Sequence, residues 1–188
     1  MTKTKLPPAE IVIRRYSEIA PSPALEAGLD AVFFEASNVK SFSDVAARRT
    51  FRERWLGRYL VHDPDLAFVA VSQSGSVLGY VVGSLKDPAF EPRFSDIPYF
   101  KVFNILTRQF PAHLHVNLAP DARNSGLGSD LVRRFISEAE KAAAPGVHVV
   151  TSRGARNVAF YNRNGFHEAG SFAEGGREIV FLARACAP

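Results

Sequence analysis

Cysteine is nearly absent from this sequence, in which Cys186 stands alone among 188 residues. A single cysteine cannot form an internal disulfide, and it cannot supply the several thiolates of a structural zinc site. Its place near the end of the sequence also argues against a catalytic thiol. We therefore expect no metal held by cysteine and no covalent intermediate on sulfur.

Long hydrophobic runs are absent as well. No stretch reaches the roughly 18 to 20 consecutive apolar residues that a membrane-spanning helix requires. The opening segment MTKTKLPPAE also has no apolar core of the kind found in secretory signal peptides. We expect a soluble, cytoplasmic protein that does not bind membranes.

The sequence has no long basic run, although its formal net charge is +4 and its pI is about 9.4. The densest group of arginines, between residues 48 and 58, is interrupted by Phe51 and Trp55, which is typical of the solvated face of an amphipathic helix. A basic balance also suits a protein that binds a polyanionic ligand. Nucleic-acid binding is a hypothesis that rests on charge alone, and we expect no nucleic-acid partner.

The composition of the sequence, with 46% hydrophobic and 22% charged residues, is typical of a globular protein. We expect a single domain over residues 1–188, of which residues 1–9 are flexible. Short β-branched or alternating segments indicate strands, and apolar residues at helical intervals indicate helices. The expected strands are residues 11–16, 66–72, 77–85, 113–118, 147–151, 166–172 and 178–183. The expected helices are residues 24–36, 43–60, 99–109, 126–143 and 157–164.

The strongest chemical signal is a turn with two glycines, Arg123-x-x-Gly126-x-Gly128, which follows an expected strand and opens an expected helix. The first turn of a helix has unpaired N–H groups and the positive end of the helix dipole, which together bind phosphates. Glycines lack a Cβ, so the backbone can approach such a ligand closely. The pattern fits neither a Rossmann fingerprint, which needs a third glycine, nor a Walker A loop, which needs Gly-Lys-Ser/Thr. A helix whose glycines only permit tight packing is the alternative.

With Pro120 before it, this segment resembles the acetyl-CoA pyrophosphate motif of the GNAT superfamily of N-acyltransferases. A second match follows at the expected spacing, because Phe160-Tyr161 and Gly165-Phe166 resemble that family's other motif, a short helix that ends in Gly-Phe. The resemblance covers nearly the whole chain. It implies an α/β (α+β) GNAT fold with a central mixed, mostly antiparallel sheet of about six to seven strands flanked by helices.

A narrower resemblance is to the acetyltransferase-like domains related to the C-terminal part of O-GlcNAcases. It is carried by the segment Phe110-Pro-Ala-His113-Leu-His115-Val-Asn117 and the aromatic residues before it. That family includes members regarded as catalytically inactive. The alternative to an enzyme is therefore an inactive acetyl-CoA-binding module for protein recognition.

The GNAT resemblance also implies roles for individual residues. The backbone of Val116 would face the thioester carbonyl, and that of Leu118 would pair with the pantetheine arm of acetyl-CoA. Amides of the loop would hold the pyrophosphate, and Asn157 would contact the pantetheine or phosphate arm. Asn124 and Ser125 depart from the usual Gly and Lys/Arg/Gln, although Asn tolerates a left-handed backbone. The implied acetyl-CoA contacts are Val116, Leu118, Arg123, Asn124, Ser125, Gly126, Leu127, Gly128, Ser129, Asn157 and Phe160.

Tyr161 matches the position at which many GNAT enzymes carry the acid that protonates the departing CoA thiolate. A phenol with an ordinary pKa of about 10 is protonated at neutral pH and can donate its proton in this way. A core tyrosine whose hydroxyl is bonded elsewhere is the alternative.

The base that removes a proton from the acceptor amine is not evident from the sequence. Ala112 stands about where histone-modifying relatives carry a glutamate. His113 and His115 point to one side of an ideal strand together with Asn117, and either imidazole is a candidate base because its ordinary pKa is about 6.5. No acidic or histidine cluster completes a metal site around them, so we expect no metal. The candidates for contact with the acceptor are Asn117, Tyr80 and Tyr99.

We therefore predict an acetyl-CoA-dependent N-acetyltransferase in which an amine attacks the thioester directly. In this mechanism the N–H of Val116 polarises the carbonyl and Tyr161 protonates the thiolate. The acceptor remains open between a small molecule and a peptide or protein lysine. We expect a monomer or a homodimer.

Overall fold

The computed structural model describes residues 11–187, which fall into two compact units. The first unit comprises residues 11–83 and 115–135, and the second comprises residues 84–114 and 136–187. The expectation that residues 1–9 are flexible lies outside the described residues. The single domain over residues 1–188 stays a prediction.

Seven strands form one mixed sheet in the order β1-β2-β3-β4-β5-β7-β6. β4 and β5 are parallel, whereas β1–β2, β2–β3, β5–β7 and β6–β7 are antiparallel pairs. The predicted α/β fold with a mixed, mostly antiparallel sheet flanked by helices is therefore confirmed. The strands are β1 (Ile11–Arg15), β2 (Phe68–Ser72), β3 (Val77–Ser84), β4 (Ala112–Leu118), β5 (Gly146–Ser152), β6 (His167–Glu174) and β7 (Arg177–Ala185).

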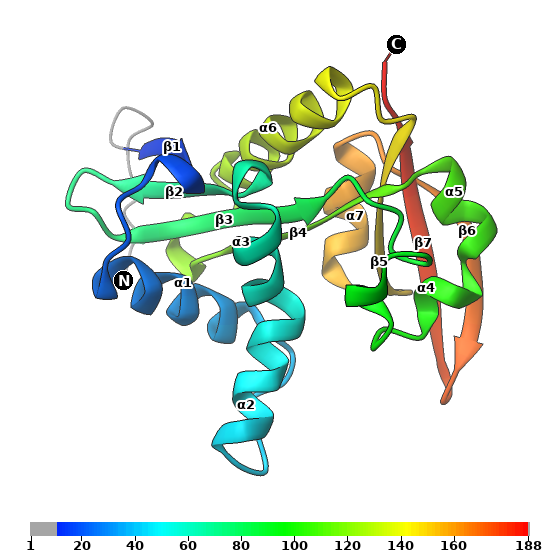
Figure 1. Ribbon diagram of the computed structural model, residues 1–188, viewed down its shortest axis with the longest axis horizontal. Coiled ribbons are helices and arrows are strands. Elements are labelled where there is room, and N and C mark those ends of the chain that lie inside the picture. The colour runs from blue at the N-terminus through cyan, green and yellow to red at the C-terminus, as the bar shows by residue number, and fades with distance from the viewer. Residues whose placement is uncertain (1–10, 188) are drawn as a thin grey trace. The chain divides into compact units, whose positions relative to one another are not determined.

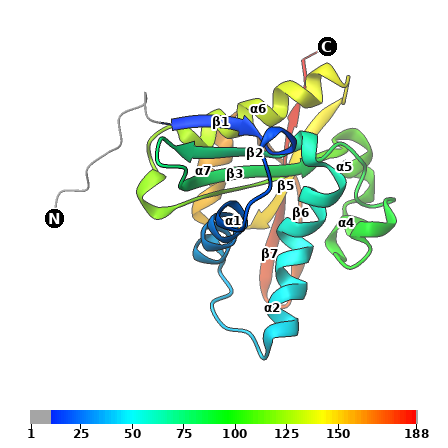
Figure 2. The same ribbon diagram turned by 60° about the vertical axis from the view of Figure 1, so that its left-hand side comes forward.

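In the first unit, helix α1 (Pro23–Ala36) lies against the three neighbouring strands β1, β2 and β3 (Figures 1 and 2). Helix α1 begins after Ser22, whose hydroxyl accepts a hydrogen bond from the N–H of Leu25. A Cβ at Gly28 would lie 2.7 Å from Cγ2 of Val77. The glycine therefore lets α1 lie close against the start of β3.

The predicted helix over residues 43–60 is present, but it is not one regular helix. Asp44 caps α2 (Val45–Arg52), and a π-helical turn, Glu53–Gly57, leads on to α3 (Arg58–His62). Apolar spacing indicates which side of a helix is buried, but not the extra residue that widens one turn. The sequence therefore did not predict the π-helical turn.

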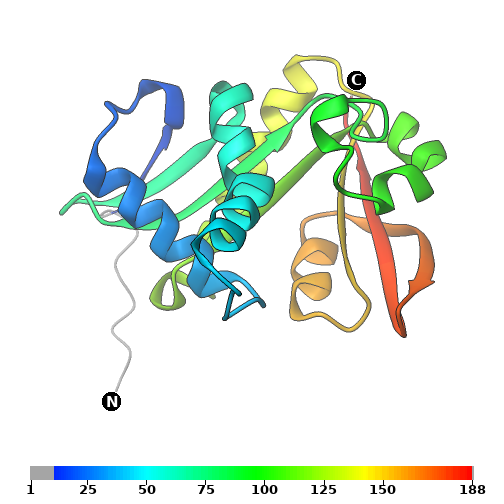
Figure 3. The ribbon, with the colours of Figure 1, turned by 60° about the horizontal axis from the view of Figure 1, so that its bottom comes forward.

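In the second unit, β5, β7 and β6 lie side by side (Figure 3). The predicted helix over residues 99–109 is two short helices, α4 (Tyr99–Val102) and α5 (Asn104–Gln109). They are separated by Phe103, whose ring lies 5.1 Å from a ring on β6 and 5.1 Å from a ring on β7. Phe103 is 5% exposed, so the break between the helices coincides with burial of an aromatic side chain.

Strand β4 and helix α6 (Leu127–Lys141) each contribute residues to both units. The helix confirms the predicted amphipathic segment over residues 126–143. Among residues 11–187, no helix combines the length and apolar character that crossing a membrane requires. The side chains that α6 buries include Leu131, Val132, Phe135, Ile136 and Ala139.

Candidate functional site

The loop between β4 and α6 has the backbone of an anion-binding turn. A short 3₁₀ turn, Pro120–Ala122, leads into it. Beyond that turn, Asn124 has a φ of 59° and Gly126 has a φ of 92°, and both values are left-handed. Left-handed residues within a turn direct successive N–H groups toward one concave side, which suits an anion. Asn124 thus adopts the left-handed backbone that asparagine tolerates better than most residues.

Several backbone N–H groups of this loop have no protein partner. Among the described residues, none accepts a hydrogen bond from the N–H of Asn124, Ser125, Gly126 or Gly128. Space is also present, because a Cβ at Gly126 would meet no atom within 4 Å. Unpaired amides at the start of a 15-residue helix attract anions. The loop therefore fits a diphosphate.

The polar side chains of the loop hold its shape. Ser125 Oγ donates to the carbonyl of Ala122 at 2.7 Å, and Arg123 Nε donates to the carbonyl of Leu118 at 3.3 Å. Ser125 carries no charge, and its hydroxyl is already engaged within the loop. Binding of phosphates at this position would therefore rely on the backbone amides.

His115 lies among aromatic side chains of the first unit. Its Nε2 is 3.2 Å from the hydroxyl of Tyr59, and its ring meets those of Trp55 and Tyr59 edge to face at centroid distances of 5.3 and 5.4 Å. Burial, and secondly the charge of Arg58, lower the pKa of His115 to about 4. An imidazole with this pKa is neutral at pH 7 and is a weak base.

Asn117 and Tyr80, two of the three residues predicted to contact the acceptor, lie together in the first unit. Asn117 Nδ2 donates to the hydroxyl of Tyr80 at 2.7 Å. Tyr80 is fully buried, and this burial raises the pKa of its phenol. Gly79 lets β4 lie close to β3, because a Cβ there would lie 2.9 Å from the carbonyl oxygen of Asn117.

Tyr161 lies in the second unit, on helix α7 (Arg156–Arg163). It is 5% exposed, and its ring packs edge to face against those of Phe160 and Phe166. Burial raises the pKa of Tyr161, so the phenol is protonated at neutral pH. Among residues 11–187 its hydroxyl has no hydrogen-bond partner, yet the oxygen is not among the atoms sealed from solvent. The hydroxyl is therefore able to donate to a ligand.

A known family matches most of this chain. The model of the acetyltransferase (GNAT) family matches residues 30–166, a segment that contains both the glycine loop and Tyr161. The chain belongs to the acetyltransferase (GNAT) family.

Solved structures share the GNAT fold of this chain. A protein described as SsHAT is 21% identical, with 95% of this chain and 100% of that protein covered and a TM-score of 0.75. A GCN5-related N-acetyltransferase from Kribbella flavida is 16% identical, with 95% and 99% covered and a TM-score of 0.64. An N-acetyltransferase from Staphylococcus aureus Mu50 is 19% identical, with 94% and 99% covered and a TM-score of 0.62. These likenesses confirm the fold, while the narrower resemblance to O-GlcNAcase domains stays a prediction.

The other residues that the GNAT motifs single out lie in the second unit. Asn157 is exposed, and its Oδ1 accepts from the hydroxyl of Thr151 at 3.0 Å. Phe160 is half-buried against Tyr161. Tyr99 is also half-buried, with its ring 4.7 Å from that of Phe100. Their contacts with acetyl-CoA or the acceptor stay predictions.

His113 is enclosed by rings of the second unit. It is 2% exposed, and the ring centroids of Phe94, Phe100 and His148 lie 4.8, 5.4 and 5.5 Å from its own. This position favours packing, and a role as base stays a prediction. His148, whose Nδ1 bonds to the carbonyl of Phe110, was not anticipated, because only the alternation of β5 marks it in the sequence. In the described part of the chain, no group of three or more His, Cys, Asp or Glu side chains could hold a metal ion.

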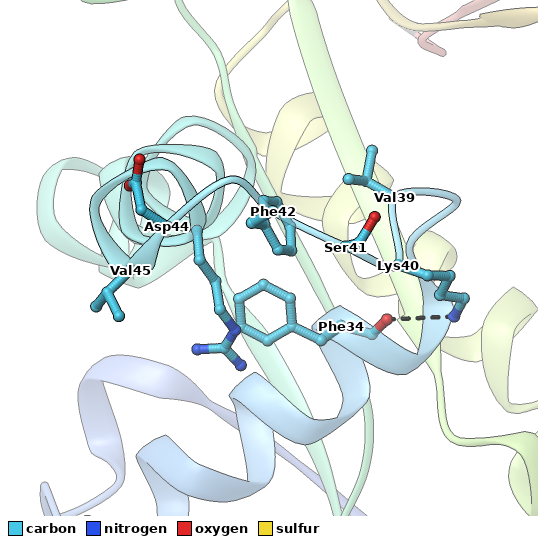
Figure 4. Close-up of a pocket in the computed structure, with 8 residues that line it drawn as sticks. Phe34, Val39, Lys40, Ser41, Phe42, Asp44 and Val45 are labelled. Atoms are coloured by element: carbon cyan, nitrogen blue, oxygen red, sulfur yellow. Dashed lines mark hydrogen bonds between the residues drawn. The ribbon is translucent and has the colours of Figure 1, made fainter.

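A hollow of about 510 Å³ lies in the first unit, where α1 ends and α2 begins (Figure 4). Lys40 Nζ bonds to the carbonyl of Phe34, and the guanidinium of Arg48 lies 3.5 Å from the centre of the Phe34 ring. No sequence motif indicates this hollow, because it arises from the way two helices pack. Its lining residues are Phe34, Val39, Lys40, Ser41, Phe42, Asp44, Val45 and Arg48.

Proposed function

We propose that this GNAT protein is an acetyl-CoA-dependent N-acetyltransferase, in which an amine attacks the acetyl thioester directly. The observation that carries the proposal is the loop at the start of α6. The N–H groups of Asn124, Ser125, Gly126 and Gly128 have no acceptor there among the described residues, and the space beside Gly126 is open. Membership of the family supports the reaction class. The acceptor amine is either a small molecule or a peptide or protein lysine.

The first unit would bind the donor through its backbone. Acetyl-CoA supplies a diphosphate for the loop amides and an acetyl thioester for the reaction. The pairing of β4 with β5 covers only Ala112 and His113, which leaves the later residues of β4 outside that register. In the proposed mechanism the backbone of Leu118 pairs with the pantetheine arm, and the N–H of Val116 stabilises the oxyanion.

Tyr161 would supply the acid. As the amine nitrogen bonds to the carbonyl carbon, the C–S bond breaks and Tyr161 gives its phenolic proton to the thiolate sulfur. The surplus proton of the amine leaves to water, and water returns a proton to the Tyr161 phenolate. The free hydroxyl of Tyr161 supports this assignment, because no described residue competes for its proton.

Replacement of Gly126 by alanine tests the binding loop. Gly126 has a φ of 92°, so Gly126→Ala strains the backbone by about 1 to 2 kcal/mol and places a methyl group where the diphosphate is proposed to lie. We expect acetyl-CoA to bind at least tenfold more weakly, as measured by calorimetry.

Gly75→Ala is the matched control for this variant. Gly75 has a φ of 82° and also has no atom within 4 Å of an added Cβ, but it lies in the β2–β3 turn. Both variants should lose similar stability in urea unfolding, while only Gly126→Ala loses affinity. Equal affinity of the two variants, or no binding of acetyl-CoA by the parent protein, would sink the proposed donor site.

A further inference from the structure

His115 is held at one of its two ring nitrogens. The hydroxyl of Tyr59 lies 3.2 Å from Nε2, and the rings of Trp55 and Tyr59 both meet the imidazole edge to face. The π-helical turn contains Trp55 and ends just before α3, which carries Tyr59. Turns of this kind are frequent at functional sites because they re-aim side chains. Here the turn places two aromatic side chains of one helical segment against one imidazole.

The second nitrogen of His115 remains available. No described residue forms a hydrogen bond with Nδ1. This atom is also not among the buried polar atoms that lack a partner, so it keeps contact with solvent. His115 therefore presents a single free polar atom, and Tyr59 determines whether that atom donates or accepts.

The surroundings of His115 favour the neutral ring. Aromatic side chains pack on it from the π-helical turn and from α3, and Arg58 is the charged group that acts on it. Burial and, secondly, the charge of Arg58 lower the pKa of His115 to about 4. A neutral imidazole carries one N–H, which can donate a hydrogen bond to an oxygen of a ligand.

We propose that His115 donates a hydrogen bond to the acceptor substrate instead of acting as its base, and that Tyr59 is the positioning residue that makes it a donor. The Tyr59 hydroxyl donates to Nε2, since a phenol is the more acidic partner, and the ring proton then resides on Nδ1. Nδ1–H binds an oxygen of the acceptor. The substrate class is a primary amine with a carbonyl or carboxylate oxygen beside its nitrogen, and this inference rests on the proposed acetyltransferase function.

Three amines with the same body test the substrate class. Phenethylamine lacks the oxygen, phenylalaninamide carries it in a carboxamide, and phenylalanine carries it in a carboxylate. With acetyl-CoA as donor, we expect kcat/KM for the better oxygen-bearing amine to exceed that for phenethylamine at least tenfold. Equal values for all three, or no acetylation of any while acetyl-CoA still binds, would overturn the substrate class.

Variants at His115 separate a donor from a base. His115→Ala should raise KM for the oxygen-bearing amines about tenfold and abolish their advantage over phenethylamine. His115→Asn places an amide N–H near the position of Nδ1 and should restore most of the advantage of the oxygen-bearing amines. The pH profile of kcat between pH 6 and 9 should be unchanged in both variants. Loss of an acidic limb of that profile in both would instead show that His115 is a base.

Nitrogen-15 NMR of the imidazole tests the positioning role without any acceptor. In the parent protein saturated with acetyl-CoA, the proton should reside on Nδ1 of His115, and Tyr59→Phe should shift it toward Nε2. Tyr16→Phe is the control, because it also removes a buried hydroxyl bond, to Glu26, but not one to His115. A proton on Nε2 in the parent protein overturns the inference. Failure to bind acetyl-CoA would instead count against the proposed function.

Discussion

Tyr80 and Tyr161 are both buried phenols with raised pKa values, but their hydroxyls differ. The hydroxyl of Tyr80 accepts a hydrogen bond from Asn117 at 2.7 Å in the first unit. The hydroxyl of Tyr161, in the second unit, has no partner among the described residues. Burial with a satisfied hydroxyl stabilises a fold, whereas burial with a free hydroxyl leaves a group for a ligand. Burial alone therefore does not separate a tyrosine whose hydroxyl is bonded within the protein from one whose hydroxyl is free to meet a ligand.

Tyr161→Phe should have the largest effect, and it falls on turnover. Without the phenol, no proton is delivered to the departing thiolate, and kcat should fall by about ten- to a thousand-fold. Acetyl-CoA should bind as before, and the free energy of unfolding should change by less than about 0.5 kcal/mol, since no protein hydrogen bond is lost. Steady-state kinetics, calorimetry and urea unfolding give the three values.

An unchanged kcat in Tyr161→Phe would contradict the proposed role of Tyr161 as the acid. The hydroxyl of Tyr161 would then be free of protein partners but without a function in turnover. A large loss of stability would show that this hydroxyl forms a structural hydrogen bond, as the hydroxyl of Tyr80 does.

His115 is a half-buried ring whose pKa is also shifted, and it makes the stability of the protein depend on pH. Its pKa of about 4 in the folded protein lies below the ordinary value of about 6.5. Between these values the unfolded chain binds a proton that the folded protein does not, so stability falls as pH decreases from about 6.5 to about 4. The loss is at most about 3 kcal/mol, and the partial solvent access of the ring reduces it.

Urea unfolding at pH 4.5 and at pH 7.5 measures this loss. His115→Asn does not titrate, so it should lose less stability between the two pH values than the parent protein does. Because every other titratable group is shared, the difference between the two proteins isolates His115. Equal losses would show that the folded protein binds the proton as readily as the unfolded chain does.

Most of the fold and the glycine-containing turn before α6 could be predicted because their signals are local. Apolar periodicity predicted the strands and helices, and Gly126 with Asn124 marked the left-handed turn that the structure contains. The neutral state of His115 could not be predicted in this way. It depends on burial and on the charge of Arg58, which lies on α3 and comes near the imidazole only through the fold. The π-helical turn and the break at Phe103 are likewise consequences of packing.

Tyr80→Phe should have the smallest effect, and it falls on stability. The change leaves the side-chain N–H of Asn117 without its acceptor, which costs about 1 to 2 kcal/mol when the partner is part-buried. Asn117→Ala and the double variant complete a mutant cycle, measured by urea unfolding. If the hydrogen bond is structural, the coupling energy should be about 1 kcal/mol. A coupling energy of zero, together with a lowered kcat in Tyr80→Phe, would instead assign the hydroxyl of Tyr80 a role in turnover, as proposed for Tyr161.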